Sequence, residues 1–165
     1  MARVYLSMGS NIDREQHIAS ALSMLSEAFG PLERSSVYES EAVGFDSPAF
    51  YNLVVGFDTD KGPRAVQRVL RHIEEQNDRV RTEQLSARTL DLDLLLYDDL
   101  LVDEEGLKLP HNDIARYAFV LGPLAEIAGS ERHPLTGERF DTLWYGFDDS
   151  DQMLTRIDWP PAEAS

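Results

Sequence analysis

Hydrophobic residues recur along the chain with two periods, one of two residues and one near 3.6 residues. The first period is typical of β-strands and the second of amphipathic α-helices. Together they predict six elements, at about residues 3–8, 13–29, 32–38, 50–58, 63–77 and 88–97. Their order is strand, helix, strand, strand, helix, strand.

This order predicts an α+β fold with a ferredoxin-like βαββαβ core, in which an antiparallel-rich sheet carries two helices on one face. A C-terminal hairpin and helix extension follows. Residues 100–102 and 107–109 predict the hairpin, and the apolar stretch 114–128 is expected to be helical in part, with an interruption at Pro123. We expect one domain over residues 1–165, with its core at about 3–128 and a packed extension at 129–165.

The last predicted strand carries two carboxylates. Its alternation places Leu90, Leu92, Leu94 and Leu96 on one face, and Asp91, Asp93, Leu95 and Tyr97 on the other. Asp91 and Asp93 are then about 6–7 Å apart, and two like charges at that distance repel by about 2.5 kcal/mol at an effective dielectric near 20. A shared cation of the Mg²⁺, Ca²⁺ or Mn²⁺ type would relieve the repulsion. The alternative is an edge strand whose acids face water.

The charge distribution narrows the class of ligand. The net charge of −15 argues against a general nucleic-acid or anionic-membrane binder. Residues 64–88 nevertheless hold six arginines against four acids, and this segment leads directly into the aspartate pair. Cations and carboxylates that converge on one place suit a metal-bound polyphosphate.

Other features of the composition fit a soluble domain. The chain has no cysteine, which excludes disulfides and thiolate chemistry. Its first residues enter a strand pattern without a signal peptide, and its longest apolar run is too short to span a bilayer. We therefore expect a cytoplasmic protein, as a monomer or weak homo-oligomer. The polar segment 78–87, longer than a usual connection, is a candidate lid.

The motif RTLDLDLLLY at 88–97 resembles the 6-hydroxymethyl-7,8-dihydropterin pyrophosphokinase family. The resemblance also rests on RVR at 79–81, PH at 110–111, MGSN at 8–11 and Asn52, and it covers about residues 3–128. It implies the ferredoxin-like fold and a transferase of folate biosynthesis. The implied reaction moves the pyrophosphoryl group of ATP onto the hydroxymethyl group of 6-hydroxymethyl-7,8-dihydropterin and releases AMP.

The resemblance also implies roles for individual residues. Asp91 and Asp93 would bind Mg²⁺ as two ions, and Arg79 and Arg88 would hold the transferring phosphates as catalytic residues. The residues implied to bind ATP are Arg81, Arg88, Leu94, His111 and Arg116. Those implied to bind the pterin are Val43, Gly44, Phe50, Asn52 and Phe119.

Two departures from the family pattern leave alternatives open. Residues 83–87, EQLSA, lack the tryptophan that would close over the pterin, and Tyr117 stands where many members carry arginine, with Arg116 one residue early. One alternative is a same-fold paralogue that binds a pterin or nucleotide with low or different activity. Another is a non-catalytic ferredoxin-like ligand-binding module. A two-metal nuclease is disfavoured by the net charge of −15.

Overall fold

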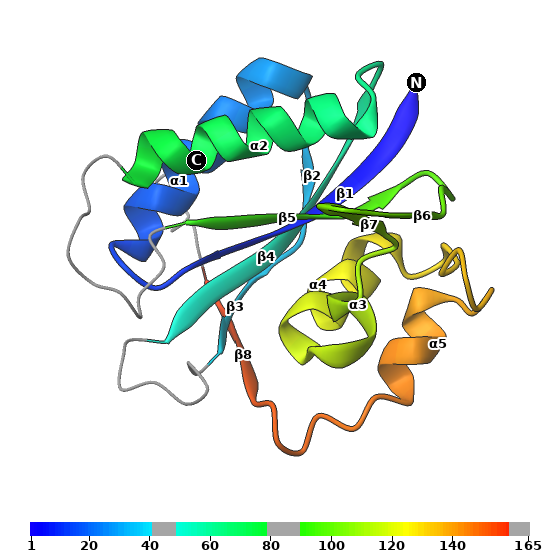
Figure 1. Ribbon diagram of the computed structural model, residues 1–165. Helices are drawn as coiled ribbons and strands as arrows, with labels where there is room; N and C mark the ends of the chain where they lie inside the picture. The colour runs from blue at the N-terminus through cyan, green and yellow to red at the C-terminus, as the bar shows by residue number, and fades with distance from the viewer. Residues whose placement is uncertain (41–48, 79–89, 159–165) are drawn as a thin grey trace.

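The computed structural model describes residues 1–40, 49–78 and 90–158. Its strands are β1 (Ala2–Ser10), β2 (Glu33–Arg34), β3 (Val37–Ser40), β4 (Phe50–Thr59), β5 (Asp91–Tyr97), β6 (Val102–Glu104), β7 (Leu107–Leu109) and β8 (Leu154–Ile157). Its helices are α1 (Arg14–Phe29), α2 (Pro63–Asp78), α3 (Asp113–Arg116), α4 (Ala118–Ala128) and α5 (Phe140–Tyr145). Figure 1 shows them arranged around one central sheet.

The main sheet has the strand order β5-β1-β4-β3-β8, and β2 also pairs with β4. Every pairing in it is antiparallel. β1 lies between β4 and β5, and its alternate residues Val4, Leu6 and Met8 are buried. The short strands β6 and β7 form a separate hairpin.

Helices cover both faces of the sheet. α1 and α2 pack on one face, around a core that includes Leu6, Ile18 and Leu70. α3, α4 and α5 lie on the opposite face (Figure 1), where Tyr5, Leu95 and Leu121 belong to a second buried cluster. The predicted mixture of helices with an antiparallel sheet is confirmed.

The simple alternation predicted for 88–97 is wrong after Leu94. Tyr5 pairs with Leu96 and Leu6 with Leu94, so Leu95 is an extra residue, a β-bulge in β5. The bulge reverses which face each later side chain takes. Leu96 packs in the cluster on the α4 side, whereas Tyr97 packs against the cluster on the α2 side, together with Leu92 and Leu94. The strand itself begins at Asp91.

Three other predicted elements also differ from the structure. The strand expected at 32–38 is divided into β2 and β3, because their registers against β4 differ by one residue. The hairpin expected at 100–102 starts later, at Val102. α4 continues through Pro123, which is buried. A proline inside a helix removes the hydrogen-bond donor that would serve the carbonyl of Phe119 and crowds that carbonyl, so the packing of α4 on β4 offsets this cost.

The C-terminal extension contributes a helix and a strand to the packed fold. α5 packs against α4, and β8 adds a further strand to the sheet next to β3. Along the described ranges, no helix combines the length and the apolar character that a membrane crossing needs.

Candidate active site

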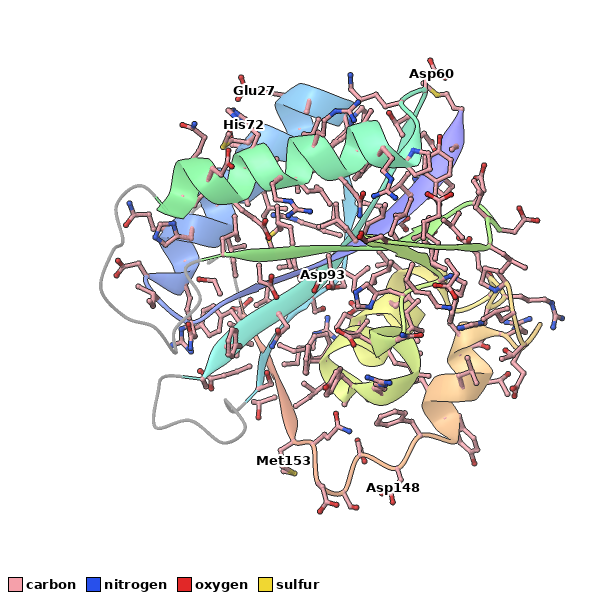
Figure 2. The ribbon with its side chains drawn as sticks, in the orientation of Figure 1. Glu27, Asp60, His72, Asp93, Asp148 and Met153 are labelled. Carbon is pink, nitrogen blue, oxygen red and sulfur yellow. The ribbon has the colours of Figure 1, made fainter. Side chains whose placement is uncertain are left out.

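Asp91 and Asp93 lie on the same face of β5, as the alternation before the bulge predicted. Asp91 pairs with Gly9 and Asp93 with Ser7 of β1, and both carboxylates are half-buried. Figure 2 shows Asp93 on the side of β5 away from α2. Because the face of β5 reverses only at Leu95, the bulge leaves the carboxylate pair intact.

Gly9 separates Asp91 from Asn52 across the sheet. It pairs with Asp91 on one side and with Asn52 of β4 on the other, so the three residues form one row across three strands. Two strand spacings place Asp91 and Asn52 about 10 Å apart. Gly9 itself has no side chain, so only a glycine stands between the carboxylate and the amide in this row.

A cavity of about 490 Å³ opens at the free edge of β5, between α2 and the β6–β7 hairpin. Its lining combines apolar and charged side chains. The lining residues are Gln67, Leu70, Arg71, Glu74, Asp91, Leu92, Asp93, Leu94, Glu104, Gly106, Leu107, Lys108 and His111. Four of these are acids and two are lysine or arginine, so the described lining carries an excess of negative charge.

Glu74 connects α2 to the peptide between the two aspartates. The backbone N–H of Leu92 donates a hydrogen bond to Glu74 Oε2 at 2.8 Å. Burial is the largest influence on this carboxyl group, and together with the negative charges of Asp91 and Asp93 it raises the pKa of Glu74 to about 7, against the opposing effects of the Leu92 hydrogen bond and Arg71. Glu74 is therefore partly protonated at neutral pH.

His111 and Asp113 extend the polar site beyond β5. The ligand atoms of Asp93, His111 and Asp113 all lie within 4.8 Å of one another. The backbone N–H of His111 donates to the carbonyl oxygen of Leu95 at 3.0 Å, which holds the residue beside the bulge. The backbone N–H of Asp113 donates to His111 Nδ1 at 3.1 Å, so a neutral imidazole carries its proton on Nε2.

Asn52 is buried and oriented by a neighbouring strand. Its Nδ2 donates to Ser40 Oγ of β3 at 2.6 Å. A Cβ built at Gly9 would be 3.1 Å from Asn52 Oδ1 and 3.7 Å from a ring carbon of Phe50, so both side chains lie over this glycine. Tyr51 instead faces the opposite side, under the guanidinium of Arg14. The aromatic residue that shares a face with Asn52 is therefore Phe50.

Phe119 lies in the first turn of α4, which packs on β4. Its ring stacks on that of Tyr117, with centroids 4.9 Å apart and planes at 21°. Tyr117 is 38% exposed, and Phe119 is half-buried. Tyr117, which stands where many members of the family carry arginine, thus extends the aromatic surface of Phe119.

The structure brings together most of the predicted residues that it describes. Asp91, Asp93, Leu94 and His111 line one cavity, whereas Arg116 is exposed at the end of α3 and is not among the described lining residues. Phe50 and Asn52 share a face of β4. Val43, Gly44, Arg79, Arg81 and Arg88 lie outside the described residues.

Sequence reasoning missed several residues at this site: Arg71, Glu74, Lys108 and Asp113. For Glu74 a signal existed, because it stands four residues after Leu70, on the side of α2 that carries Val66 and Ile73. For Lys108 there was none, since its place depends on how the β6–β7 hairpin folds against α2.

Comparison with known proteins identifies the family. The model of the family described as 7,8-dihydro-6-hydroxymethylpterin-pyrophosphokinase (HPPK) matches residues 5–129. The 2-amino-4-hydroxy-6-hydroxymethyldihydropteridine pyrophosphokinase of Pseudomonas aeruginosa is 39% identical over 140 residues, which cover 80% of this chain and 84% of that protein. The protein of that name from Methylorubrum extorquens is 39% identical over 132 residues, covering 78% and 84%.

Longer relatives match only in part. The folic acid synthesis protein fol1 of Pneumocystis carinii is 36% identical over 137 residues, which are 81% of this chain but 18% of that protein. A crystal structure of the A437G variant of Plasmodium falciparum HPPK-DHPS aligns with a TM-score of 0.69 at 14% identity, covering 87% of this chain and 45% of the other. This chain therefore spans about a fifth of the fungal relative and under half of the solved one. The match to residues 5–129 and the bacterial relatives show that the chain belongs to the 7,8-dihydro-6-hydroxymethylpterin-pyrophosphokinase family.

Proposed function

We propose that this protein transfers the pyrophosphoryl group of ATP to the hydroxymethyl oxygen of 6-hydroxymethyl-7,8-dihydropterin and releases AMP. The hydroxymethyl oxygen attacks the β-phosphorus, and the bond from that phosphorus to the oxygen bridging it to the α-phosphorus breaks. The observation that carries the proposal is the row Asp91, Gly9 and Asn52. It sets a carboxylate suited to a metal ion and an amide suited to a heterocycle on one face, with only a glycine between them.

We propose the ferredoxin-like topology for the core. Its support is the strand order β5-β1-β4-β3 with α1 and α2 on one face. On this proposal residues 1–165 form one domain, with a core at about 3–128 and an extension at 129–165.

The cavity suits the nucleotide. Leu70, Leu94 and Leu107 offer apolar walls for a flat base, and Gln67 and Lys108 offer polar groups beside them. Because Leu92 directs its N–H away from β1 toward Glu74, the antiparallel pattern directs the peptide groups of Leu94 toward the same free edge. Backbone donors and acceptors at that edge can bond the rim of adenine.

The donor set fits divalent cations of the Mg²⁺ type. Asp91 and Asp93 supply carboxylate oxygens, which these hard cations prefer. The described lining has more acids than bases, so it would repel a polyphosphate unless cations neutralised it. Bound Mg²⁺ would supply charge neutralisation at the phosphoryl oxygens. His111, with its proton on Nε2, can donate to a phosphate oxygen without being charged.

The pterin would lie across Gly9, toward β4. Asn52 can pair with the donors and acceptors of the ring, and Phe50 and Phe119 offer aromatic faces for a flat heterocycle. Arg79 and Arg88 as phosphate clamps, Arg81 and Arg116 toward ATP, and Val43 and Gly44 toward the pterin stay predictions from the family resemblance.

The test is pterin-dependent formation of AMP. Purified protein is mixed with ATP, Mg²⁺ and 6-hydroxymethyl-7,8-dihydropterin, and AMP is measured with and without the pterin. We expect AMP only when both substrates and the metal are present. Absence of pterin-dependent AMP alongside Mg²⁺-dependent ATP binding would replace this proposal with a paralogue that uses another acceptor. Failure to bind ATP would refute the assignment of the cavity.

A further inference from the structure

Gln152 of the C-terminal extension holds the chain on both sides of Tyr117. The backbone N–H of Ala118 donates to Gln152 Oε1 at 2.8 Å, and Gln152 Nε2 donates to the carbonyl oxygen of Arg116 at 3.0 Å. The side-chain amide thus uses its acceptor and its donor on two backbone groups that flank one residue. Gln152 lies beyond the part of the chain that the family model matches, residues 5–129.

The position of these hydrogen bonds matters for Phe119. Ala118 is the first residue of α4, where a backbone N–H has no acceptor within its own helix. Gln152 provides that acceptor, and it also holds the preceding turn at the end of α3. Phe119 is the next residue of α4 and stacks on Tyr117, so both rings extend from the backbone that Gln152 holds.

The same segment reaches the other side of the proposed pterin site. Two residues after Gln152 the chain enters β8, which pairs with β3 so that Leu154 lies opposite Ser40. Ser40 Oγ in turn accepts the hydrogen bond from Asn52 Nδ2 at 2.6 Å. Figure 1 shows β8 running alongside β3 after the loop that passes below α4, and Figure 2 labels Met153 at the start of this strand.

The strand β8 also packs directly against α4. A Cβ built at Gly122 of α4 would be 3.3 Å from Leu154 Cδ1, so α4 and β8 are in direct contact. Glu126 also ties α4 to β3, by accepting a hydrogen bond from the Tyr38 hydroxyl at 2.8 Å. Glu126 lies two turns beyond Phe119, however, whereas Gln152 acts on the first turn.

We propose that residues 152–157 brace the pterin side of the site, with Gln152 as the positioning residue that sets Phe119 relative to Asn52. The brace touches no substrate; it acts through Ala118 and Arg116 at one end and through Ser40 at the other. The proposal deepens the proposed function and rests on it for its kinetic consequence. It assigns the extension a role in binding the acceptor. The ATP cavity lies at the opposite edge of the sheet, and Arg116, which Gln152 holds only by its backbone carbonyl, is not among the residues described as lining that cavity.

The first test compares Michaelis constants in the Gln152→Ala variant of the full chain. We expect the KM for 6-hydroxymethyl-7,8-dihydropterin to rise about tenfold, equivalent to about 1.4 kcal/mol, while the KM for ATP stays within about twofold. Met153→Ala is the matched control, because it truncates a side chain of similar length at the next position, which is 73% exposed. An equal change in both Michaelis constants, or no change in either, would overturn the brace.

Gln152→Glu gives a second, milder variant. Its carboxylate still accepts from Ala118 but cannot donate to Arg116, so we expect a pterin effect between those of wild type and Gln152→Ala. If Gln152→Ala does not fold, Gln152→Glu carries the same comparison of the two Michaelis constants, and an unchanged pterin KM in it refutes the proposal.

Amide hydrogen exchange tests the brace independently of turnover. In Gln152→Ala we expect faster exchange at Ala118 and at the following amides of α4, with exchange in α2 unchanged. Unchanged exchange at Ala118 would refute the brace whatever the enzyme does. A wild-type protein that forms no pterin-dependent AMP but shows the exchange effect would refute the proposed function and leave the brace supported as a structural element.

Discussion

Replacing Glu74 with glutamine should remove a pH dependence from the stability of the protein. The carboxyl group is half-buried between α2 and β5, beside Asp91 and Asp93, and its pKa in the folded protein is about 7 against an ordinary 4.5. The folded state keeps this proton up to about pH 7, whereas the unfolded chain releases it near pH 4.5. The folded state therefore binds more protons in that window, and the free energy of unfolding falls as pH rises through it.

The size of the effect follows from the shift. A difference of one pKa unit corresponds to about 1.4 kcal/mol, so raising the pKa of Glu74 from 4.5 to about 7 sets an upper limit of about 3 kcal/mol. Solvent screens a carboxyl group that is only half-buried, and we expect about 1–2 kcal/mol. Glutamine cannot ionise, and its carbonyl oxygen can still accept the hydrogen bond from the Leu92 N–H.

The measurement is urea unfolding of wild type and Glu74→Gln at pH 5 and pH 8. Wild type should lose about 1–2 kcal/mol more than the variant between these two pH values, or about 3–6 °C in the unfolding temperature of a domain of this size. Glu75→Gln, the same substitution at the adjacent exposed position, should behave as wild type. If the stabilities of wild type and Glu74→Gln change in parallel with pH, the pKa of Glu74 in the folded protein is not raised.

Three further changes probe the site. Asp93→Asn should lower kcat by about two to three orders of magnitude, because metal stabilisation of the reacting phosphates is worth several kcal/mol, and circular dichroism should show intact folding; wild-type turnover would exclude a metal role. Gly9→Ala should lower the free energy of unfolding in urea by about 1–3 kcal/mol, because its Cβ would lie 3.1 Å from Asn52 Oδ1, and it should raise the KM for the pterin. If both values stay unchanged, the Asn52 side chain moves aside freely. Lys108→Ala should raise the KM for ATP several-fold without affecting that for the pterin, because Lys108 lines the cavity; the reverse pattern would place the nucleotide elsewhere.

The pattern of hydrophobic and polar residues predicted the structure correctly where residues close in the sequence determine it. The alternation around Asp91 and Asp93 correctly placed both carboxylates on one face, because side-chain direction in a strand is set by the backbone period. The same rule failed at Leu95, because the bulge arises from how β5 pairs with β1, a strand more than 80 residues earlier. Likewise Pro123 was expected to interrupt a helix, yet the packing of α4 on β4 retains the helix through it.

The site likewise contains residues that the sequence motifs predicted and residues that only the folded structure reveals. The motifs pointed to Asp91, Asp93 and His111, and the structure brings these residues to one cavity. Glu74 entered the sequence analysis only as one acid in a mixed segment, because its contact with Leu92 depends on how α2 packs against β5. Gln152 had no signal at all, since its partners Arg116 and Ala118 lie more than 30 residues away.

Residue types at short fixed spacings were enough to predict the strand and helix periods, the carboxylate pair and the family. Three features became visible only in the folded protein: Gly9 separates Asp91 from Asn52, Glu74 accepts a hydrogen bond from the peptide between the aspartates, and the chain after α5 returns to hold α4 and β3. These features depend on register and packing between distant segments. Backbone pairing and side-chain burial set that geometry only once the whole sheet has formed.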